Sequence, residues 1–201
     1  SSPLPNKLII ELQKSLEMRY GENPHQKAAF YKSSDNRIGV ADAIQLQGKE
    51  LSYNNINDAD AAFELISEFT KPTVAIVKHA NPCGVAENTN INLAWENALQ
   101  TDPVSAFGGI VALNRELTLN LANHMKSLFL EVIIAPSVSQ DALKIFKDKP
   151  NVRILVYSSI PSPNDPGLVA KSISGGMLVQ TRDNNILQKK ILKFIKKYTQ
   201  F

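Results

Sequence analysis

The sequence has a single cysteine and no long apolar run. Cys83 is the only thiol among 201 residues, which excludes an intrachain disulfide and a zinc site built mostly from cysteines. No segment approaches the roughly 18 consecutive apolar residues that a transmembrane helix needs, and the start lacks the charged and then apolar pattern of a signal peptide. These absences predict a soluble, cytoplasmic protein without a membrane partner.

A strong charge of either sign is also lacking. Lysine and arginine number 22 and aspartate and glutamate 19, for a formal net charge of +3. The main basic cluster has the spacing of a solvated helix face, so we expect no nucleic-acid partner. It consists of Lys189, Lys190, Lys193, Lys196 and Lys197. The apolar fraction of 43% suffices for one substantial core, or for one domain and the start of another.

Short apolar runs alternate with amphipathic segments along most of the chain. This alternation predicts an α/β fold with a sheet covered by helices. Asn57 or Asp58 is expected to cap the first helix. Residues 8–12 fit either a strand or a helical turn. The expected strands are 43–46, 74–77, 110–113, 132–134, 152–156 and 174–179, and the expected helices are 59–69, 93–99, 119–130, 142–146 and an apolar-faced terminal helix at 187–198.

The stretch from Thr73 to Gly84 ends in two adjacent basic side chains. Residues 74–77 are apolar without interruption, which is typical of a strand buried on both faces. Lys78 and His79 follow at once. Pro82 and then Gly84, through a turn with a positive backbone torsion, are expected to end the strand. Strand ends of this kind carry functional sites in α/β proteins.

Lys78 and His79 suit the attack of a weak nucleophile on a carbonyl carbon. The imidazole would take the proton of the nucleophile, and the ammonium would stabilise the oxyanion or help the leaving nitrogen depart. Neighbours in a regular strand point to opposite faces, so the backbone must twist or bulge for both to reach one substrate. The alternative is a solvated Lys78 and a packed His79 with a satisfied hydrogen bond.

Two polar loops are further candidate sites. Residues 19–26, Arg-Tyr-Gly-Glu-Asn-Pro-His-Gln, contain an arginine suited to phosphate and a histidine, although a plain surface pair is the alternative for Arg19 and Tyr20. Residues 102–109 end in paired glycines, which either let the backbone approach a ligand or form a simple turn between helix and strand.

A histidine followed by Pro82-Cys83 is similar to the ligand pattern of zinc deaminases. Residue 81 is asparagine where the catalytic glutamate belongs, and a second cysteine is absent. His25 and His124 lie far away in the sequence. We therefore expect no catalytic metal.

Several segments occur in one order and together resemble the bifunctional purine-biosynthesis family, specifically its aminoimidazole carboxamide ribonucleotide (AICAR) transformylase domain. They are Arg19–Gln26, Gly48–Asp58, Val77–Gly84, Ser105–Ala112, Glu131–Pro136 and Lys171–Gln180. The resemblance implies a transferase of purine biosynthesis that moves a formyl group from 10-formyltetrahydrofolate, its co-substrate, to the exocyclic amine of AICAR. It also implies a cytidine deaminase-like fold, with a mixed β-sheet and helices on both faces but without the zinc of the deaminases.

The resemblance implies a homodimer and a multifunctional protein that is also a hydrolase, IMP cyclohydrolase. By this resemblance His79 is the proton acceptor, Lys78 is the oxyanion or leaving-group partner, and His25 assists. The substrate-binding residues that it implies are Arg19 and Tyr20 at the nucleotide phosphate, Asn55 and Glu131 at the nucleotide, and Phe107 and Gly108 on the folate side.

The resemblance also implies a domain organisation. Residues 1–18 are expected to be a connector that follows a missing cyclohydrolase domain, 19–183 the first half of the transformylase domain, and 184–201 the start of a truncated second half. Half of the active site is then expected to lie outside this chain. The alternative function is a folded but catalytically incomplete nucleotide-binding fragment of that enzyme.

Overall fold

The computed structural model describes residues 3–33 and 37–184. The terminal helix expected at 187–198 and the lysine cluster lie outside these residues. The chain divides into a larger unit, Glu11–Pro161, and a second unit made of Ser1–Ile10 and Ser162–Phe201. No helix among the described residues is long and apolar enough to cross a membrane.

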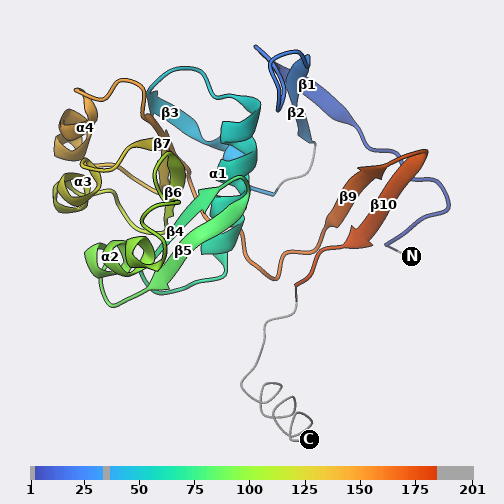
Figure 1. Ribbon diagram of the computed structural model, residues 1–201. Coiled ribbons are helices and arrows are strands. Elements are labelled where there is room, and N and C mark those ends of the chain that lie inside the picture. The colour runs from blue at the N-terminus through green and yellow to red at the C-terminus, as the bar shows by residue number, and fades with distance from the viewer. Residues whose placement is uncertain (1–2, 34–36, 185–201) are drawn as a thin grey trace, which may run out of the picture. The chain divides into compact units, whose positions relative to one another are not determined.

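The larger unit is built on a mixed sheet of six strands (Figure 1). The strand order is β3-β8-β7-β6-β4-β5, in which β6, β7 and β8 run parallel and the other neighbouring pairs run antiparallel. The strands are β3 (Ile44–Gln47), β4 (Thr73–Lys78), β5 (Asn81–Glu87), β6 (Gly109–Leu113), β7 (Leu130–Ala135) and β8 (Arg153–Val156). The predicted α/β class with a mixed sheet is confirmed.

Helices cover both faces of this sheet, as Figure 1 shows. Because strand side chains alternate, Val74 and Ile76 of β4 pack into one core cluster and Ala75 and Val77 into the other. The first cluster includes side chains of three helices and the second those of one. The three are α2 (Ile91–Thr101), α3 (Leu119–Met125) and α4 (Gln140–Phe146), and the one is α1 (Tyr53–Ser67).

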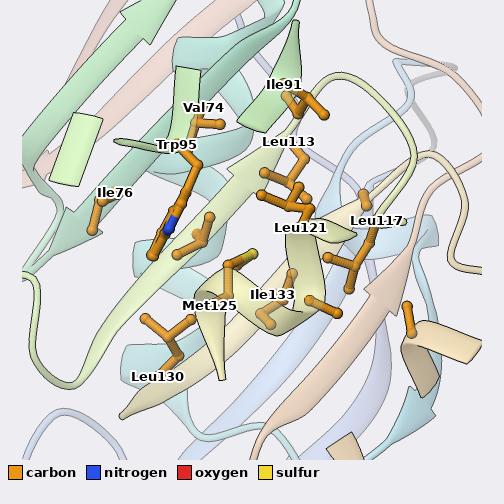
Figure 2. Packing of buried hydrophobic residues seen from close by; sticks show 14 of the residues in the cluster. Val74, Ile76, Ile91, Trp95, Leu113, Leu117, Leu121, Met125, Leu130 and Ile133 are labelled. Carbon is orange, nitrogen blue, oxygen red and sulfur yellow. The ribbon is translucent and has the colours of Figure 1, made fainter. Parts of the chain in front are cut away.

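The core on the three-helix face centres on large side chains from α2, α3 and the strands (Figure 2). Trp95 of α2 is 2% exposed and lies among residues that include Val74, Ile76 and Leu113. Burying a Leu- or Ile-sized side chain stabilises a fold by about 1.5–3 kcal/mol, so this cluster fixes α2 firmly on the sheet.

The core on the α1 face contains a buried tyrosine. The ring of Tyr157 packs edge-on against Phe63 of α1, with centroids 4.9 Å apart. Its hydroxyl donates a hydrogen bond of 2.8 Å to the carbonyl oxygen of Leu113. Burial raises the pKa of the Tyr157 hydroxyl above its ordinary value, since the charged form loses its hydration.

The first helix begins earlier than the sequence led us to expect. We expected a helix at 59–69 capped by Asn57 or Asp58, whereas α1 starts directly after Ser52. The Ser52 hydroxyl accepts the Asn55 N–H, and the Asn55 side chain accepts the Ser52 N–H. Because this reciprocal capping box satisfies the first free amides, the expected caps were wrong, and Asp58 lies inside the helix.

The helix expected at 119–130 is shorter than predicted. Helix α3 has only seven residues. The carbonyl of Phe129 accepts the Gly108 N–H at 2.8 Å, and Leu130 pairs with Gly109 of β6. These bonds draw the chain into the sheet, so β7 begins before the expected 132–134.

The sequence did not predict the hairpin that precedes the sheet. Strands β1 (Leu12–Met18) and β2 (Ala28–Ser33) pair antiparallel and flank the 19–27 loop. Residues 8–11 form neither of the two structures left open for them, because the strand begins only at Leu12. A short 3-10 turn, η1 (Val40–Asp42), then leads toward β3.

The second unit contains a separate hairpin of β9 (Leu168–Ile173) and β10 (Gly176–Thr181). We expected a strand at 174–179, and β10 confirms it with a shift of two residues. The turn contains Gly175 with a φ of 76°, which explains a glycine at this position. The strand β9 was not predicted.

Candidate functional site

The β4–β5 hairpin presents Lys78 and His79. Lys78 pairs with Asn81 across a two-residue turn, in which His79 and Ala80 both have a φ of 55°. Positive φ at both central residues defines a type I′ turn, whose usual residues are asparagine and glycine. For residues with a Cβ atom this conformation costs roughly 1–2 kcal/mol each. The backbone thus leaves regular strand geometry at His79. Such a departure was expected if the side chains of Lys78 and His79 are to reach the same ligand.

Strand β4 ends after Lys78 as expected, but the roles predicted for Pro82 and Gly84 in that strand end were wrong. Both residues lie within β5, which returns along β4 as the last strand of the sheet. An edge strand tolerates proline because one side of its backbone has no strand partner. Gly84 has no positive φ, but a Cβ there would lie 1.9 Å from the carbonyl oxygen of Ala98 in α2. The close approach of α2 therefore requires this glycine.

A carboxylate from α1 holds the left-handed turn. Asp58 accepts the N–H of His79 on Oδ2 at 3.0 Å and the N–H of Ala80 on Oδ1 at 2.9 Å. The side chain of Asn81 donates to the His79 carbonyl at 2.7 Å. Hydrogen bonds to a charged group are stronger than neutral ones, so the pair offsets part of the cost of the turn.

Lys78 contacts the loop that was expected to line the folate side. Its Nζ donates to the carbonyl oxygen of Phe107 at 2.8 Å. The Phe107 ring packs against Phe129 with centroids 5.3 Å apart, and Gly108 has a φ of 73°, which favours glycine there. The two glycines after Phe107 thus form part of a turn that also supports Lys78.

The same loop begins with a local hydrogen bond. The Ser105 N–H donates to Asp102 Oδ1 at 2.9 Å. Hydrogen bonds from Ser105 lower the pKa of the Asp102 carboxyl from its ordinary value because they stabilise the charged form.

Three polar side chains from α1, β7 and β8 meet beside the turn. Glu131 Oε2 accepts from Arg153 Nη1 at 2.9 Å and from Asn55 Nδ2 at 3.4 Å. Asn55 is 6% exposed, and it also belongs to the capping box of α1. Arg153 therefore orients a carboxylate that still has acceptor capacity for a ligand.

The 19–27 loop supplies an arginine and a tyrosine. The guanidinium carbon of Arg19 lies 5.3 Å from the centroid of the Tyr20 ring, a cation–π arrangement. The loop is closed by the Gly21 N–H, which donates to the Gln26 carbonyl at 2.9 Å. The side chain of Asn54 donates to the Glu22 carbonyl at 3.4 Å, which ties the loop to the start of α1.

A cavity of about 820 Å³ connects these groups. Every substrate-binding residue predicted from the sequence lines it, together with Lys78 and His79. His25 is exposed in the 19–27 loop and is not among the lining residues. Its assisting role stays a prediction.

Among the cavity-lining residues that sequence analysis did not assign to the site, Asp58 and Arg153 make the contacts described above. Asp58 was considered only as a helix cap. The pattern Ser52-x-x-Asn55 was the signal that places the cap earlier and leaves Asp58 for another role. Arg153 gave no signal, since an arginine at the start of a short strand is common.

Among residues 3–33 and 37–184, no cluster of three or more histidine, cysteine, aspartate or glutamate side chains is arranged to hold a metal ion. Cys83 lies half-buried in β5, and burial raises the pKa of its thiol.

The fold and the cavity define an α/β protein with a polar cavity beside the Lys78–His79 turn at one end of its mixed sheet. The family model of the AICARFT/IMPCHase bienzyme matches residues 1–200, so the chain belongs to that family.

Its curated relatives include proteins named bifunctional purine biosynthesis protein PurH. The chain is 54% identical over 201 residues to the protein of Sinorhizobium medicae, covering 98% of this chain and 38% of the relative. Identity is 56% over 184 residues to that of Sinorhizobium fredii (90% and 34%) and 57% over 173 residues to that of a Chelativorans species (85% and 32%). The chain thus spans about a third of the length of these relatives.

Proposed function

We propose that the cavity belongs to the site at which a bifunctional purine-biosynthesis enzyme transfers a formyl group from 10-formyltetrahydrofolate to the exocyclic amine of AICAR. The observation that carries the proposal is the shared cavity. Lys78 and His79 lie there with the arginine and tyrosine of the 19–27 loop and with Glu131. A basic pair beside anion-binding and hydroxyl-binding groups suits acyl transfer to a nucleotide.

His79 is the proposed general base. The amine nitrogen of AICAR attacks the formyl carbon, a carbon–nitrogen bond forms, and the formyl oxygen becomes an oxyanion. The imidazole takes a proton from the attacking nitrogen. The oxyanion then re-forms the carbonyl as the bond between the formyl carbon and the folate nitrogen breaks, and that nitrogen takes up a proton from the imidazolium or from the Lys78 ammonium. General-base help of this kind contributes about 10²–10⁴-fold to a rate. The delocalised lone pair of the amine makes that help necessary.

Lys78 is the proposed partner of the oxyanion or of the leaving nitrogen. An ammonium group has three N–H donors, and one of them is bonded to the Phe107 carbonyl. That bond fixes the side chain and leaves two donors for the reacting atoms. A well-placed donor to an oxyanion contributes about 10²–10³-fold to a rate.

The remaining cavity residues are proposed to hold the two substrates. Arg19 and Tyr20 contact the nucleotide phosphate, and Glu131, oriented by Arg153, accepts hydroxyl or amide donors. The ring of Phe107 is 58% exposed and offers an apolar surface on the folate side. Asn55 and Gly108 complete these two walls, and His25 is proposed only to assist from the loop.

The finer architecture is also our proposal. The mixed sheet with helices on both faces supports a cytidine-deaminase-like fold. We propose a cytoplasmic homodimer whose whole chain is also an IMP cyclohydrolase. In it, 1–18 is the connector, 19–183 the first transformylase half and 184–201 the start of the second. A chain that covers 38% of a relative's length is compatible with such a division.

The same short span is compatible with one alternative, a folded nucleotide-binding fragment that lacks part of the catalytic site. In this case the chain binds AICAR but does not transfer the formyl group. The two candidates differ in turnover and not in nucleotide binding.

Formyl transfer by two proteins tests the proposal. One is the chain itself, and the other is a chimaera in which the chain replaces the matching segment of the Sinorhizobium medicae relative. If the chimaera turns over, the isolated chain does not, and both bind AICAR, the proposal is supported and the isolated chain is a catalytically incomplete fragment. Turnover by the isolated chain excludes the hypothesis that it is a catalytically incomplete fragment. A folded chimaera without turnover overturns the proposal.

Nucleotide binding has a matched pair of variants. Arg19→Ala removes a positive charge from the cavity, and Lys144→Ala removes one from α4 on the other face of the sheet. Loss of a charge-assisted phosphate contact should weaken AICAR binding about tenfold or more in the first variant only. Equal affinities in the two variants would remove Arg19 from the proposed site.

A further inference from the structure

We infer that Asp58 is a positioning residue that directs His79 into the cavity by holding the left-handed turn of the β4–β5 hairpin; this inference rests on the proposed function. Its carboxylate accepts both central amides of the turn, at 3.0 and 2.9 Å. Neither contact involves the imidazole ring. Asp58 therefore acts on His79 through the backbone and not through the proton that the ring accepts.

The turn needs such support because of its residues. His79 and Ala80 both have a φ of 55°, in the left-handed region that residues with a Cβ atom rarely adopt. Type I′ turns are usually made by asparagine and glycine, which enter this region easily. With histidine and alanine the turn depends on outside bonds. Within the described residues, a half-buried carboxylate supplies two of them.

The position of Asp58 is itself fixed. It lies inside α1, whose start is set by the capping box of Ser52 and Asn55. Residues three and four apart lie on the same helix face, so Asn54, Asn55 and Asp58 all face the cavity. The helix thus supplies one wall of the site and also sets the direction of His79.

A hydrogen bond from the backbone to a side chain can serve stability alone. A positioning role differs because it predicts a loss in the chemical step while nucleotide affinity is kept. Small misplacements of a catalytic group cost up to about a hundredfold in rate. The groups proposed to bind the nucleotide, Arg19 and Glu131, make no bond to Asp58 and should still bind it.

Asp58→Asn is the main variant, because it keeps the side-chain shape but places an NH₂ group against one of the two amides. Asp141→Asn is the matched control, an exposed aspartate of α4 paired with Lys144. In the chimaera, Asp58→Asn should lower kcat about tenfold to a hundredfold with KM for AICAR within about threefold. The control should leave both constants unchanged.

A second variant tests the mechanism. Ala80→Gly removes the Cβ penalty from one of the two strained residues, so it should raise the kcat of Asp58→Asn by about fivefold. A role of Asp58 through its charge alone predicts no such recovery.

Hydrogen exchange of the peptide spanning residues 77–83 provides a readout without turnover. Asp58→Asn should speed exchange of the turn amides by about tenfold, the effect of one lost charge-assisted hydrogen bond. Unchanged exchange overturns the inference. Faster exchange with an unchanged kcat also overturns the positioning role of Asp58 but leaves the proposed function intact. A wild-type chimaera without turnover overturns both the proposed function and the positioning role.

Discussion

Replacing Gly84 by alanine tests why β5 contains a glycine where we had expected a turn. A Cβ at this position would lie 1.9 Å from the Ala98 carbonyl oxygen, 2.9 Å from its carbonyl carbon and 3.3 Å from Thr101 Cβ. The first gap is 1.5 Å short of the 3.4 Å at which ordinary contact begins. Two of these atoms belong to the backbone of α2, so no side-chain rotation relieves the overlap. Either α2 or β5 has to move.

The cost follows from the packing around α2. Overpacking costs about 1–3 kcal/mol, and the upper end applies because Trp95 anchors the helix in the core. Alanine recovers about 0.5–1 kcal/mol relative to glycine in a strand. The free energy of unfolding should therefore fall by about 2 kcal/mol or more, which corresponds to a drop in Tm of roughly 4–8 °C for a chain of this length.

Urea unfolding followed by tryptophan fluorescence measures this change, because Trp95 is the single tryptophan. Gly176→Ala is the control: nothing lies within 4 Å of the added Cβ, and the residue has no positive φ. We expect its stability to be unchanged or slightly higher. An unfolding midpoint of Gly84→Ala equal to that of the control would refute the close approach of α2.

Two further predictions concern a buried tyrosine and a partly buried ion pair. Tyr157→Phe removes a hydrogen bond to Leu113 and should cost about 1 kcal/mol near neutral pH. Because burial raises the pKa of this hydroxyl in the folded state, its contribution is fully present below about pH 10 and declines as the pH rises further, so denaturant titrations should show a smaller alkaline loss in the variant. Equal alkaline slopes would contradict this. Glu131→Gln leaves the Arg153 guanidinium, whose side chain is 14% exposed, without its counter-charge. In the chimaera, KM for AICAR should rise about tenfold, and stability should fall by about 1–3 kcal/mol. A variant with wild-type KM would show that Glu131 does not contact the nucleotide.

The sheet was predictable because its central strands are continuous apolar runs. Residues such as Val74–Val77 are buried on both faces, and an apolar run this short fits a central strand of a covered sheet. Strand β5 was missed because Pro82 was taken as a stop, and the edge position that tolerates it depends on the order of strands in the sheet. Strands β1, β2 and β9 were missed because they lack a buried apolar run.

The candidate site was predictable where the chemistry is local. Lys78 and His79 stand out at the end of a buried strand, and the structure brings them into one cavity with the other predicted binding residues. Arg153 acts through its contact with Glu131, 22 positions away, and Asp58 through its contact with the backbone of His79, 21 positions away. Such pairings follow from the packing of α1, β7 and β8 and leave no pattern in the sequence.

The rate of formyl transfer by His79→Ala in the chimaera tests the central claim most directly. His124→Ala is the matched control, since its side chain is partly exposed on α3 and does not line the cavity. Loss of the general base predicts a kcat about 10²–10⁴-fold lower with little change in KM for AICAR, and an unchanged rate in the control. A His79→Ala enzyme whose kcat equals that of the control would contradict the account.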